Sequence, residues 1–225
     1  MAHTASFLKS YLKEVVQDVR NSWRAAFASI WFQPSELANC QFLRYVHYRE
    51  IQNWVTQRRS NGWNIEKGIE FGGTNGLIRG LFADIDYEAA SNWPQTDIQN
   101  LVSYDNNSYD VVVIDNVLEH VPSPEMAIQE LWRILRPRGA CICTTPFLIK
   151  IHADPGDYWR FTEQGLRVLF RRFQEVHISG WGNRYTLKTI SKYGWLSARN
   201  TKRLWKVALW NEGEWPISYL TVAIK

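Results

Sequence analysis

The run DVVVID at residues 110–115 constrains the fold more than any other part of the sequence. Its consecutive apolar, β-branched side chains favour an extended backbone, and their unbroken apolar character indicates burial on both faces of a sheet. Strands of this kind occur almost only in parallel sheets that helices cover on two sides. The run therefore predicts a central parallel strand in an α/β domain.

Strand and helix patterns alternate around this central strand. The segment EMAIQELWRIL has helical spacing, and Ser123 and Pro124 before it suit the N-cap and the first helical position. Further strands are predicted from short, mostly apolar runs at 67–71, 83–86, 140–146, 173–180 and 217–225. Alternation of this kind predicts a doubly wound, Rossmann-like sheet with right-handed crossovers.

The chain before the first strand carries only helical patterns, in two stretches on either side of Pro34. We therefore expect an N-terminal helical cap over 1–62 and one domain over 63–225, because single α/β domains reach this size. Residues 182–216 separate the last two strands and interleave Tyr and Trp with Lys and Arg. This insertion is predicted as a cover over an acceptor site, with a solvated pair of amphipathic helices as the alternative.

Composition excludes several classes of protein. Hydrophobic residues make up 45% of the chain and charged residues 21%, which is typical of a globular core, and no apolar run is long enough to span a membrane. The N-terminus is too polar for a signal peptide. Cys40, Cys141 and Cys143 follow no zinc-binding spacing and cannot all pair, which predicts a reduced, cytoplasmic protein without a structural metal. No metal ligands are assigned. The net charge of +4 is not concentrated in blocks, so nucleic acid is disfavoured as a partner, and a homodimer is left open.

The turn IEFGGTNG at 69–76 follows a predicted strand and opens a helix. Its glycines let backbone amides approach a ligand, and the helix N-terminus favours electron-rich groups. A purely structural turn is the alternative. No G-x-G-x-x-G fingerprint can be written here, which disfavours a nicotinamide-dependent oxidoreductase.

Acidic residues follow at positions that suit a nucleoside. Asp84 and Asp86 stand at the predicted end of the next strand, where an acid accepts from ribose hydroxyls, or they form a solvated strand end. Asp97, before the apolar Ile98, is a candidate acceptor for an adenine amino group. Asp115 and the residues after it lie beyond the carboxyl end of a parallel strand, where open α/β sheets bind ligands.

The runs VLEHVPSPEMAIQELWRILRPRG, EFGGTNG and FTEQGLRVLFRRFQEVHISGWGN resemble class I S-adenosylmethionine (SAM)-dependent methyltransferases over residues 65–182. They resemble more narrowly a small-molecule branch in which a strand ending TTPF leads into an H-x-x-P-x-D-Y-W-R-F-T segment. The resemblance implies a seven-stranded, mostly parallel sheet with an antiparallel last strand, and SAM as the cofactor. It places the cofactor contacts on Glu70, Gly72, Gly73, Thr74, Gly76, Asp84, Asp86, Asp97, Ile98, Asp115, Asn116 and Val117.

One of these positions departs from the family pattern. Thr74 stands where the family usually has the middle glycine of the turn. Its hydroxyl would contact the methionine carboxylate of SAM, or its side chain would crowd the cofactor.

Methyl transfer from a sulfonium asks the protein to position the acceptor and remove its proton. His152 is the candidate general base, because imidazole titrates near neutral pH and the residue follows a strand end on the ligand side of the sheet. Asp154 or Asp157 is expected to orient His152 or share its role. His120 is the competing base, with a hydrogen-bonded scaffold as its alternative, and His47 is assigned no role.

The acceptor pocket is expected to be aromatic. Its predicted contacts are Tyr158, Trp159, Arg160 and Trp181. For Tyr158 and Trp159 the alternative is packing of the loop onto the sheet, and for Arg160 it is a pair with Asp157. The sequence thus predicts methyl transfer to an oxygen or nitrogen of a natural-product or sugar-like small molecule. The alternatives are a SAM- or substrate-binding protein without transfer activity and an RNA methyltransferase.

Overall fold

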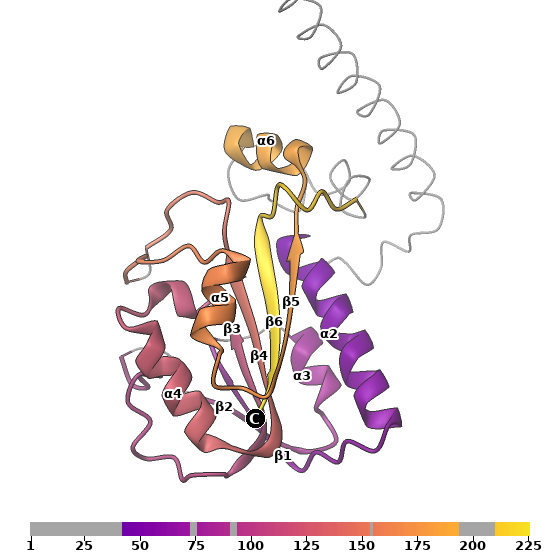
Figure 1. Cartoon of the computed structure of the whole chain (residues 1–225), viewed down its shortest axis with the longest axis vertical. Helices are drawn as coiled ribbons and strands as arrows, with labels where there is room; N and C mark the ends of the chain where they lie inside the picture. Colours follow the sequence, from indigo (N-terminus) through magenta and orange to yellow (C-terminus); the bar gives the residue numbers. More distant parts are fainter. Residues whose placement is uncertain (1–41, 73–75, 91–93, 154, 194–209) are drawn as a thin grey trace, which may run out of the picture.

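The computed structural model describes residues 42–72, 76–90, 94–153, 155–193 and 210–225, which form a layered α/β domain (Figure 1). Its sheet has the strand order β2-β1-β3-β4-β6-β5. The strands are β1 (Lys67–Phe71), β2 (Asp86–Ala89), β3 (Tyr109–Asp115), β4 (Leu135–Pro146), β5 (Glu175–Trp181) and β6 (Ser218–Ile224). Strands β2, β1, β3 and β4 are parallel, whereas β6 is antiparallel to both β4 and β5. The described residues thus form a mixed, Rossmann-like sheet of six strands, one fewer than the seven expected.

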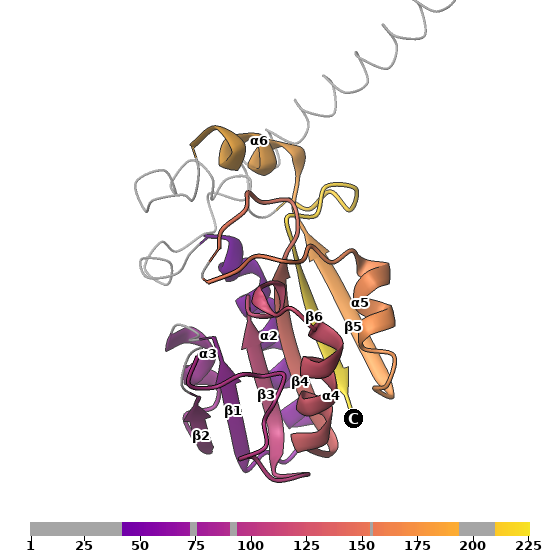
Figure 2. The same cartoon turned by 90° about the vertical axis from the view of Figure 1, so that its left-hand side faces the viewer.

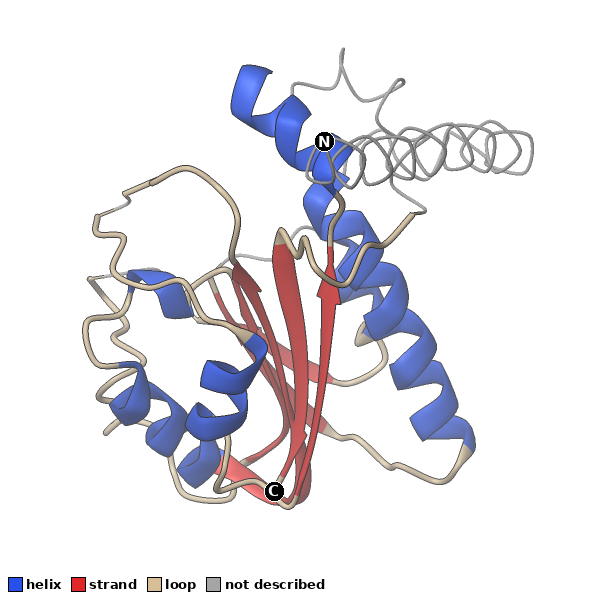
Figure 3. Cartoon of the chain, turned by 45° about the horizontal axis from the view of Figure 1, so that its top comes forward, coloured by secondary structure: helices blue, strands red, loops and turns tan. Residues whose placement is uncertain are grey.

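Helices cover both faces of the sheet, as the doubly wound prediction requires (Figures 2 and 3). Helices α2 (Phe42–Ser60) and α3 (Gly76–Leu81) lie on one face, and α4 (Pro124–Ile134) and α5 (Glu163–Leu169) lie on the other. Helix α4 begins where Ser123 and Pro124 predicted it. Helix α6 (Arg184–Tyr193), from the start of the predicted insertion, lies beyond the strand ends, and 194–209 is outside the described residues.

The central strand β3 is buried on both faces. Val112 and Ile114 belong to the core under α4 and α5, while Val111 and Val113 belong to the core under α2 and α3. All four side chains are at most 1% exposed. The β-branched run therefore adopts the position in the sheet that the sequence predicts.

Helix α2 packs directly on the sheet and belongs to the α/β domain. Tyr48, Ile51 and Val55 are buried in the core that contains Val111 and Val113. Residues 42–60 of the expected cap thus form a helix packed on the sheet, and 1–41 lie outside the described residues. Among the described residues, none of the helices combines the length and apolar character that a membrane span requires.

The second strand begins later than predicted. The expected strand at 83–86 is mostly a turn after α3, in which Ile85 N donates to Phe82 O, and β2 begins at Asp86. Asp86 pairs with Lys67, the first residue of β1, so Asp84 and Asp86 lie at the amino end of the strands. An acid at this edge is remote from the carboxyl ends that bind ligands. The predicted ribose contacts at these two positions are therefore wrong.

Candidate functional site

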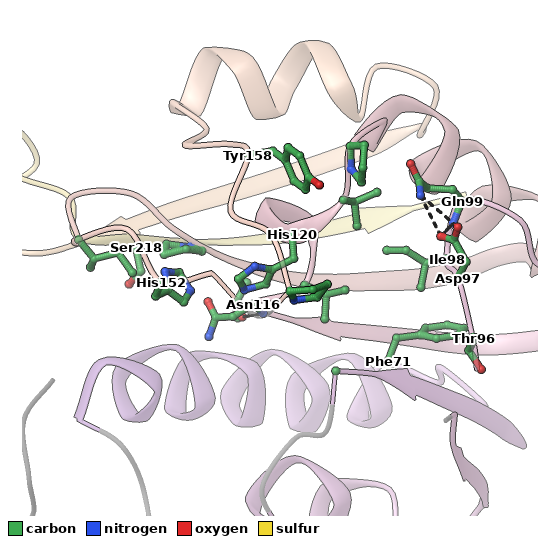
Figure 4. Close-up of a pocket in the computed structure, with 18 of the residues that line it drawn as sticks. Phe71, Thr96, Asp97, Ile98, Gln99, Asn116, His120, His152, Tyr158 and Ser218 are labelled. Carbon is green, nitrogen blue, oxygen red and sulfur yellow. Dashed lines mark hydrogen bonds between the residues drawn. The ribbon is translucent and has the colours of Figure 1, made fainter. Parts of the chain in front are cut away.

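A cavity of about 1030 Å³ opens at the carboxyl ends of β1, β3 and β4 (Figure 4). Its wall combines residues of α2, the loop 94–99, the segment after β3 and the loop after β4. Parallel strands that end at one edge bring these segments together, although they are far apart in the sequence. The cavity is therefore the candidate cofactor and acceptor site.

The turn after β1 approaches the segment after β3 very closely. Gly72 has φ +94°, and a Cβ atom there would lie 2.1 Å from Val117 Cγ2. Only glycine tolerates both this backbone conformation and this contact. Gly72 and Val117 line the cavity, Gly76 begins α3, and Gly73 and Thr74 lie outside the described residues.

Glu70 supports this turn and does not line the cavity. Its buried carboxylate forms an ion pair with Arg79 of α3 and accepts a 3.2 Å hydrogen bond from Tyr87 of β2. The Glu70 carboxylate raises the pKa of Arg79, and burial is the main cause of the raised pKa of Tyr87. Glu70 thus joins β1, β2 and α3 behind the turn.

The loop 94–99 provides a second wall of the cavity. Asp97 Oδ1 accepts hydrogen bonds from the backbone N (2.9 Å) and side-chain Nε2 (3.0 Å) of Gln99. Gln99 Oε1 in turn accepts from Ser123 N at 2.9 Å, which fixes the loop to the start of α4. Ile98 is only 4% exposed, and all three loop residues line the cavity (Figure 4). The predicted adenine contacts are thus on the cavity wall.

Asp115, at the end of β3, is a buried carboxylate with many donors. Tyr48 of α2 and Thr144 of β4 donate hydrogen bonds to it, and Arg44 Nη1 lies 3.5 Å from its Oδ2. The next residue, Asn116, has φ +53° and points its amide at Asp115 Oδ1, 3.3 Å away. Asn116 lines the cavity, whereas Asp115 fixes α2, β3 and β4 to one another behind it.

Glu119, His120 and His152 form a cluster at the cavity, and the two histidines lie close to Asn116 (Figure 4). Glu119 is 0% exposed, and within the described part of the chain neither of its carboxylate oxygens has a hydrogen-bond partner. The Nε2 atoms of His120 and His152 each lie 3.6 Å from Glu119 Oε1. The two rings meet edge to face with centroids 4.9 Å apart, and both line the cavity (Figure 4). The Glu119 carboxylate raises the pKa of His152, and burial opposes this effect.

The loop 151–160 holds this cluster in place. The backbone N atoms of Tyr158 and Trp159 donate to Glu119 O at 2.8 and 3.3 Å, and Gly156 O accepts from His120 Nδ1. Asp157 Oδ2 accepts from His152 N at 2.7 Å and lies 3.4 Å from His152 Nδ1. The loop therefore positions His152 against the short helix η2 (Leu118–His120).

Asp157 itself is held by Arg160. Arg160 Nη2 donates to Asp157 Oδ2 at 2.6 Å, and a second contact joins Nη1 to Oδ1. These bonds are the main cause of a strongly lowered pKa of Asp157, so this carboxylate is charged near neutral pH. Asp157 and Arg160 stand behind His152 and do not line the cavity.

The predicted acceptor contacts separate into two groups. Tyr158 lines the cavity and is 56% exposed. Trp159 stacks on Phe161 and donates from Nε1 to Val121 O at 2.9 Å, while Trp181 is buried in β5. Of these residues, only Tyr158 faces the cavity.

Helix α2 contributes two wall residues to which sequence reasoning gave no role. Arg44 and the buried His47 line the cavity, and His47 Nε2 lies 2.8 Å from Ser218 Oγ of β6. Burial lowers the pKa of His47 to about 4, so its ring is neutral near pH 7. The signal in the sequence is the helical spacing of Arg44, His47, Tyr48 and Ile51 on one face of α2.

Comparisons with known proteins agree with this architecture. A family model described as a methyltransferase domain matches residues 81–143, a segment that contains β2, β3, α4 and most of β4. Among curated protein sequences, none matches this chain.

Solved structures share the fold. The chain is similar to a SAM-dependent methyltransferase from Archaeoglobus fulgidus, with a TM-score of 0.50 and 12% identity over 79% of this chain and 94% of that one. It is also similar to phosphoethanolamine N-methyltransferase 2 of Haemonchus contortus in complex with SAM, with a TM-score of 0.50 and 12% identity over 78% of this chain and 52% of that one. The matched domain and the shared fold support a SAM-dependent methyltransferase, an enzyme whose cofactor is S-adenosylmethionine.

Proposed function

We propose that the protein transfers the methyl group of SAM to an oxygen or nitrogen of a small-molecule acceptor that binds beside His152. The continuity of the cavity carries this proposal, because one space of about 1030 Å³ borders both Gly72 and His152. Pockets for single drug-sized ligands have volumes of about 300–1,000 Å³. A cofactor and a small natural-product or sugar-like acceptor therefore fit into it together.

The cofactor is proposed to lie against the ends of β1 and β3. Gly72 has no side chain, so the backbone of the turn borders the cavity directly, and Val117 and Asn116 line the wall beside it. Asp97 and Ile98 would hold the adenine through a polar edge and an apolar face. When bound, SAM supplies an electrophilic methyl group on a positively charged sulfur.

The acceptor is proposed to bind at the Glu119–His120–His152 cluster, with Tyr158 at its entrance. A hydroxyl acceptor must lose its proton for methyl transfer, and His152 is the proposed base because it lines the cavity beside a buried carboxylate. Hydrogen bonds hold the loop that contains His152, so the orientation of the His152 ring is fixed, as proton removal from an acceptor requires. We also propose a cytoplasmic location, in keeping with the free thiols of Cys141 and Cys143.

Calorimetric titration with SAM and with its demethylated product tests the cofactor site, and NAD serves as the negative control. We expect both sulfur compounds to bind and NAD not to bind. His152→Ala should retain SAM binding and lose methyl transfer to a panel of phenols, sugars and amines, scored by release of the demethylated cofactor. The proposal would be refuted if neither SAM nor its demethylated product bound. If His152→Ala retained full methyl transfer, His152 would have no role in the reaction.

A further inference from the structure

We propose that Glu119, His120 and His152 form a binding site for a divalent transition-metal cation, with Zn²⁺ as the best match. Their ligating atoms all lie within 4.8 Å of one another. Two imidazoles and one carboxylate make up a common catalytic zinc ligand set, in which a fourth position stays open for water or substrate. The spacing of the cysteines excludes only a structural zinc site bound by cysteine and gives no information on this cluster.

The hydrogen bond between His120 and Gly156 is the first observation that favours a cation. His120 Nδ1 bonds to the carbonyl oxygen of Gly156, and a carbonyl can only accept. In the neutral ring, the proton is then on Nδ1 and the Nε2 lone pair faces Glu119 Oε1. Two electron-rich atoms facing each other in a buried space are stabilised by a cation between them.

The second observation is the distance between these atoms. Each Nε2–Oε1 separation is 3.6 Å, which is longer than the usual hydrogen-bond range. Two ligands that each lie about 2.1 Å from a tetrahedral ion are separated by about 3.4 Å. The observed separations are therefore closer to those of neighbouring ligands than to those of a hydrogen-bonded pair.

The third observation is the state of Glu119 itself. Its carboxylate is fully buried, and both oxygens are without a hydrogen-bond partner in the described part of the chain. A buried carboxylate of this kind is costly unless it is paired or binds a metal. The exposed pair His177–Glu50 has the same 3.6 Å separation at the surface, where water solvates both groups.

The surroundings of the histidines match those of metal ligands. Such histidines usually present their other ring nitrogen to a carboxylate or a backbone carbonyl, which fixes the ring and its tautomer. His152 Nδ1 lies 3.4 Å from Asp157 Oδ2, and His120 Nδ1 bonds to Gly156 O. Arg160 in turn holds Asp157. His120 Nδ1 therefore has an outer hydrogen-bond partner, His152 Nδ1 has a carboxylate 3.4 Å away, and both rings direct Nε2 at Glu119.

The role of the cation rests on the proposed function and narrows the acceptor to an oxygen compound, such as a phenol or an enol. Coordination lowers the pKa of a hydroxyl, as it does for metal-bound water. The acceptor hydroxyl would lose its proton to solvent at the open position. The S–CH₃ bond of SAM would then break as the O–CH₃ bond forms. In the loaded enzyme, His152 is a ligand of the cation and no longer the base.

Metal binding can be measured on the full-length protein without cofactor or acceptor. After treatment with a chelator, the protein is titrated with Co²⁺, whose visible absorption reports its ligands, and then with Zn²⁺ and Mg²⁺. We expect about one tightly bound Co²⁺ or Zn²⁺ per chain and weaker binding of Mg²⁺. His152→Ala and His120→Ala should lose more than the about 10–100-fold in affinity that outer partners contribute, whereas the control His177→Ala should bind normally.

Each outcome decides one of the two proposals. Failure of the wild-type protein to bind Co²⁺ or Zn²⁺, or normal binding by both cluster variants, would overturn the metal site. Full methyl transfer by the chelated protein would overturn the role of the cation and return His152 to the role of base. Metal binding without any binding of SAM would instead refute the proposed function.

Discussion

Two buried carboxylates in the segment DNVLE have opposite surroundings. Asp115 is 1% exposed and meets Tyr48, Thr144 and Arg44. Glu119 is 0% exposed, yet its oxygens have no hydrogen-bond donor within the described residues and face two imidazoles at 3.6 Å. Burial is therefore the same, and the difference lies in the partners.

This difference separates a structural carboxylate from a functional one. A carboxylate whose lone pairs are all occupied fixes the elements that supply the donors, and it has little capacity left for a ligand. A buried carboxylate without donors is costly, and such costs are concentrated at functional sites. We therefore propose that Asp115 supports the fold behind the proposed cofactor site and that Glu119 serves the proposed acceptor site.

Removal of Asp115 should have the largest effect on stability. Asp115→Ala would leave the hydroxyls of Tyr48 and Thr144 and the Arg44 guanidinium without their acceptor, so we expect a loss of about 3–5 kcal/mol in the free energy of unfolding. Urea denaturation measures this loss. The control Asp84→Ala removes an exposed acid and should leave both the unfolding midpoint and SAM affinity unchanged. A stable Asp115→Ala protein would contradict the structural role.

Substitution of Glu119 should affect methyl transfer strongly and stability little, the opposite of the effect expected for Asp115. Glu119→Gln keeps the volume and removes a buried charge whose oxygens have no hydrogen-bond donor among the described residues, although two imidazoles lie 3.6 Å away, so the loss of stability should be much smaller than in Asp115→Ala. Methyl transfer should fall by about 10³-fold, which corresponds to about 4 kcal/mol of transition-state stabilisation. Steady-state kinetics and thermal denaturation of the same preparation measure both effects. Loss of stability with unimpaired transfer would show that Glu119 resembles Asp115 after all.

The stability of the protein should also depend on pH through His47, which lines the cavity. Its pKa is about 4 in the folded protein and 6.5 ordinarily, so between these values the unfolded chain binds more protons. The stability contribution is therefore complete above pH 6.5 and is lost as the pH falls toward 4, by up to about 3 kcal/mol. Urea denaturation at several pH values, compared with His47→Gln, isolates this effect. An identical pH dependence in the variant would contradict the assignment.

Gly72→Ala should have a smaller effect that is limited to the cofactor end. A Cβ atom at φ +94° and 2.1 Å from Val117 Cγ2 would force the turn after β1 away from the segment after β3. We expect SAM affinity to fall by at least about tenfold, which corresponds to about 1.4 kcal/mol, while Co²⁺ binding at the cluster stays unchanged. Calorimetry with each ligand measures the two ends separately. Equal losses for both ligands would show that the ends are not independent.

The parts of the fold that local pattern determines could be predicted. The run at 110–115 is buried on both faces, and the boundaries of the helix after Ser123 and of the late strands follow from turn residues and periodicity. The second strand was misplaced, because β2 is a short, largely exposed edge strand whose alternation is weak. The preceding turn at Phe82–Ile85 instead carries the apolar residues that pack on α2 and α3.

The candidate site was predictable only as far as strand ends and motifs reveal it. Asn116, His120 and His152 were placed on the ligand side because they follow strand ends, and Asp97 was chosen for the apolar Ile98 after it and for the family resemblance. All four line the cavity. The partner of His47 is Ser218, which is 171 residues away in the chain, so no local pattern reveals it. The absence of hydrogen-bond donors around the Glu119 carboxylate, within the described residues, is likewise a property of the folded structure that no local sequence pattern reveals.

A crystal structure of the full-length protein with demethylated SAM, grown in the presence of Co²⁺, tests the central claim most directly. We expect the adenine beside Asp97 and Ile98, the amino-acid end beside Gly72, and the sulfur facing the Glu119–His120–His152 cluster with Co²⁺ bound there. A cofactor outside the cavity, or one whose sulfur points away from the cluster, would contradict it.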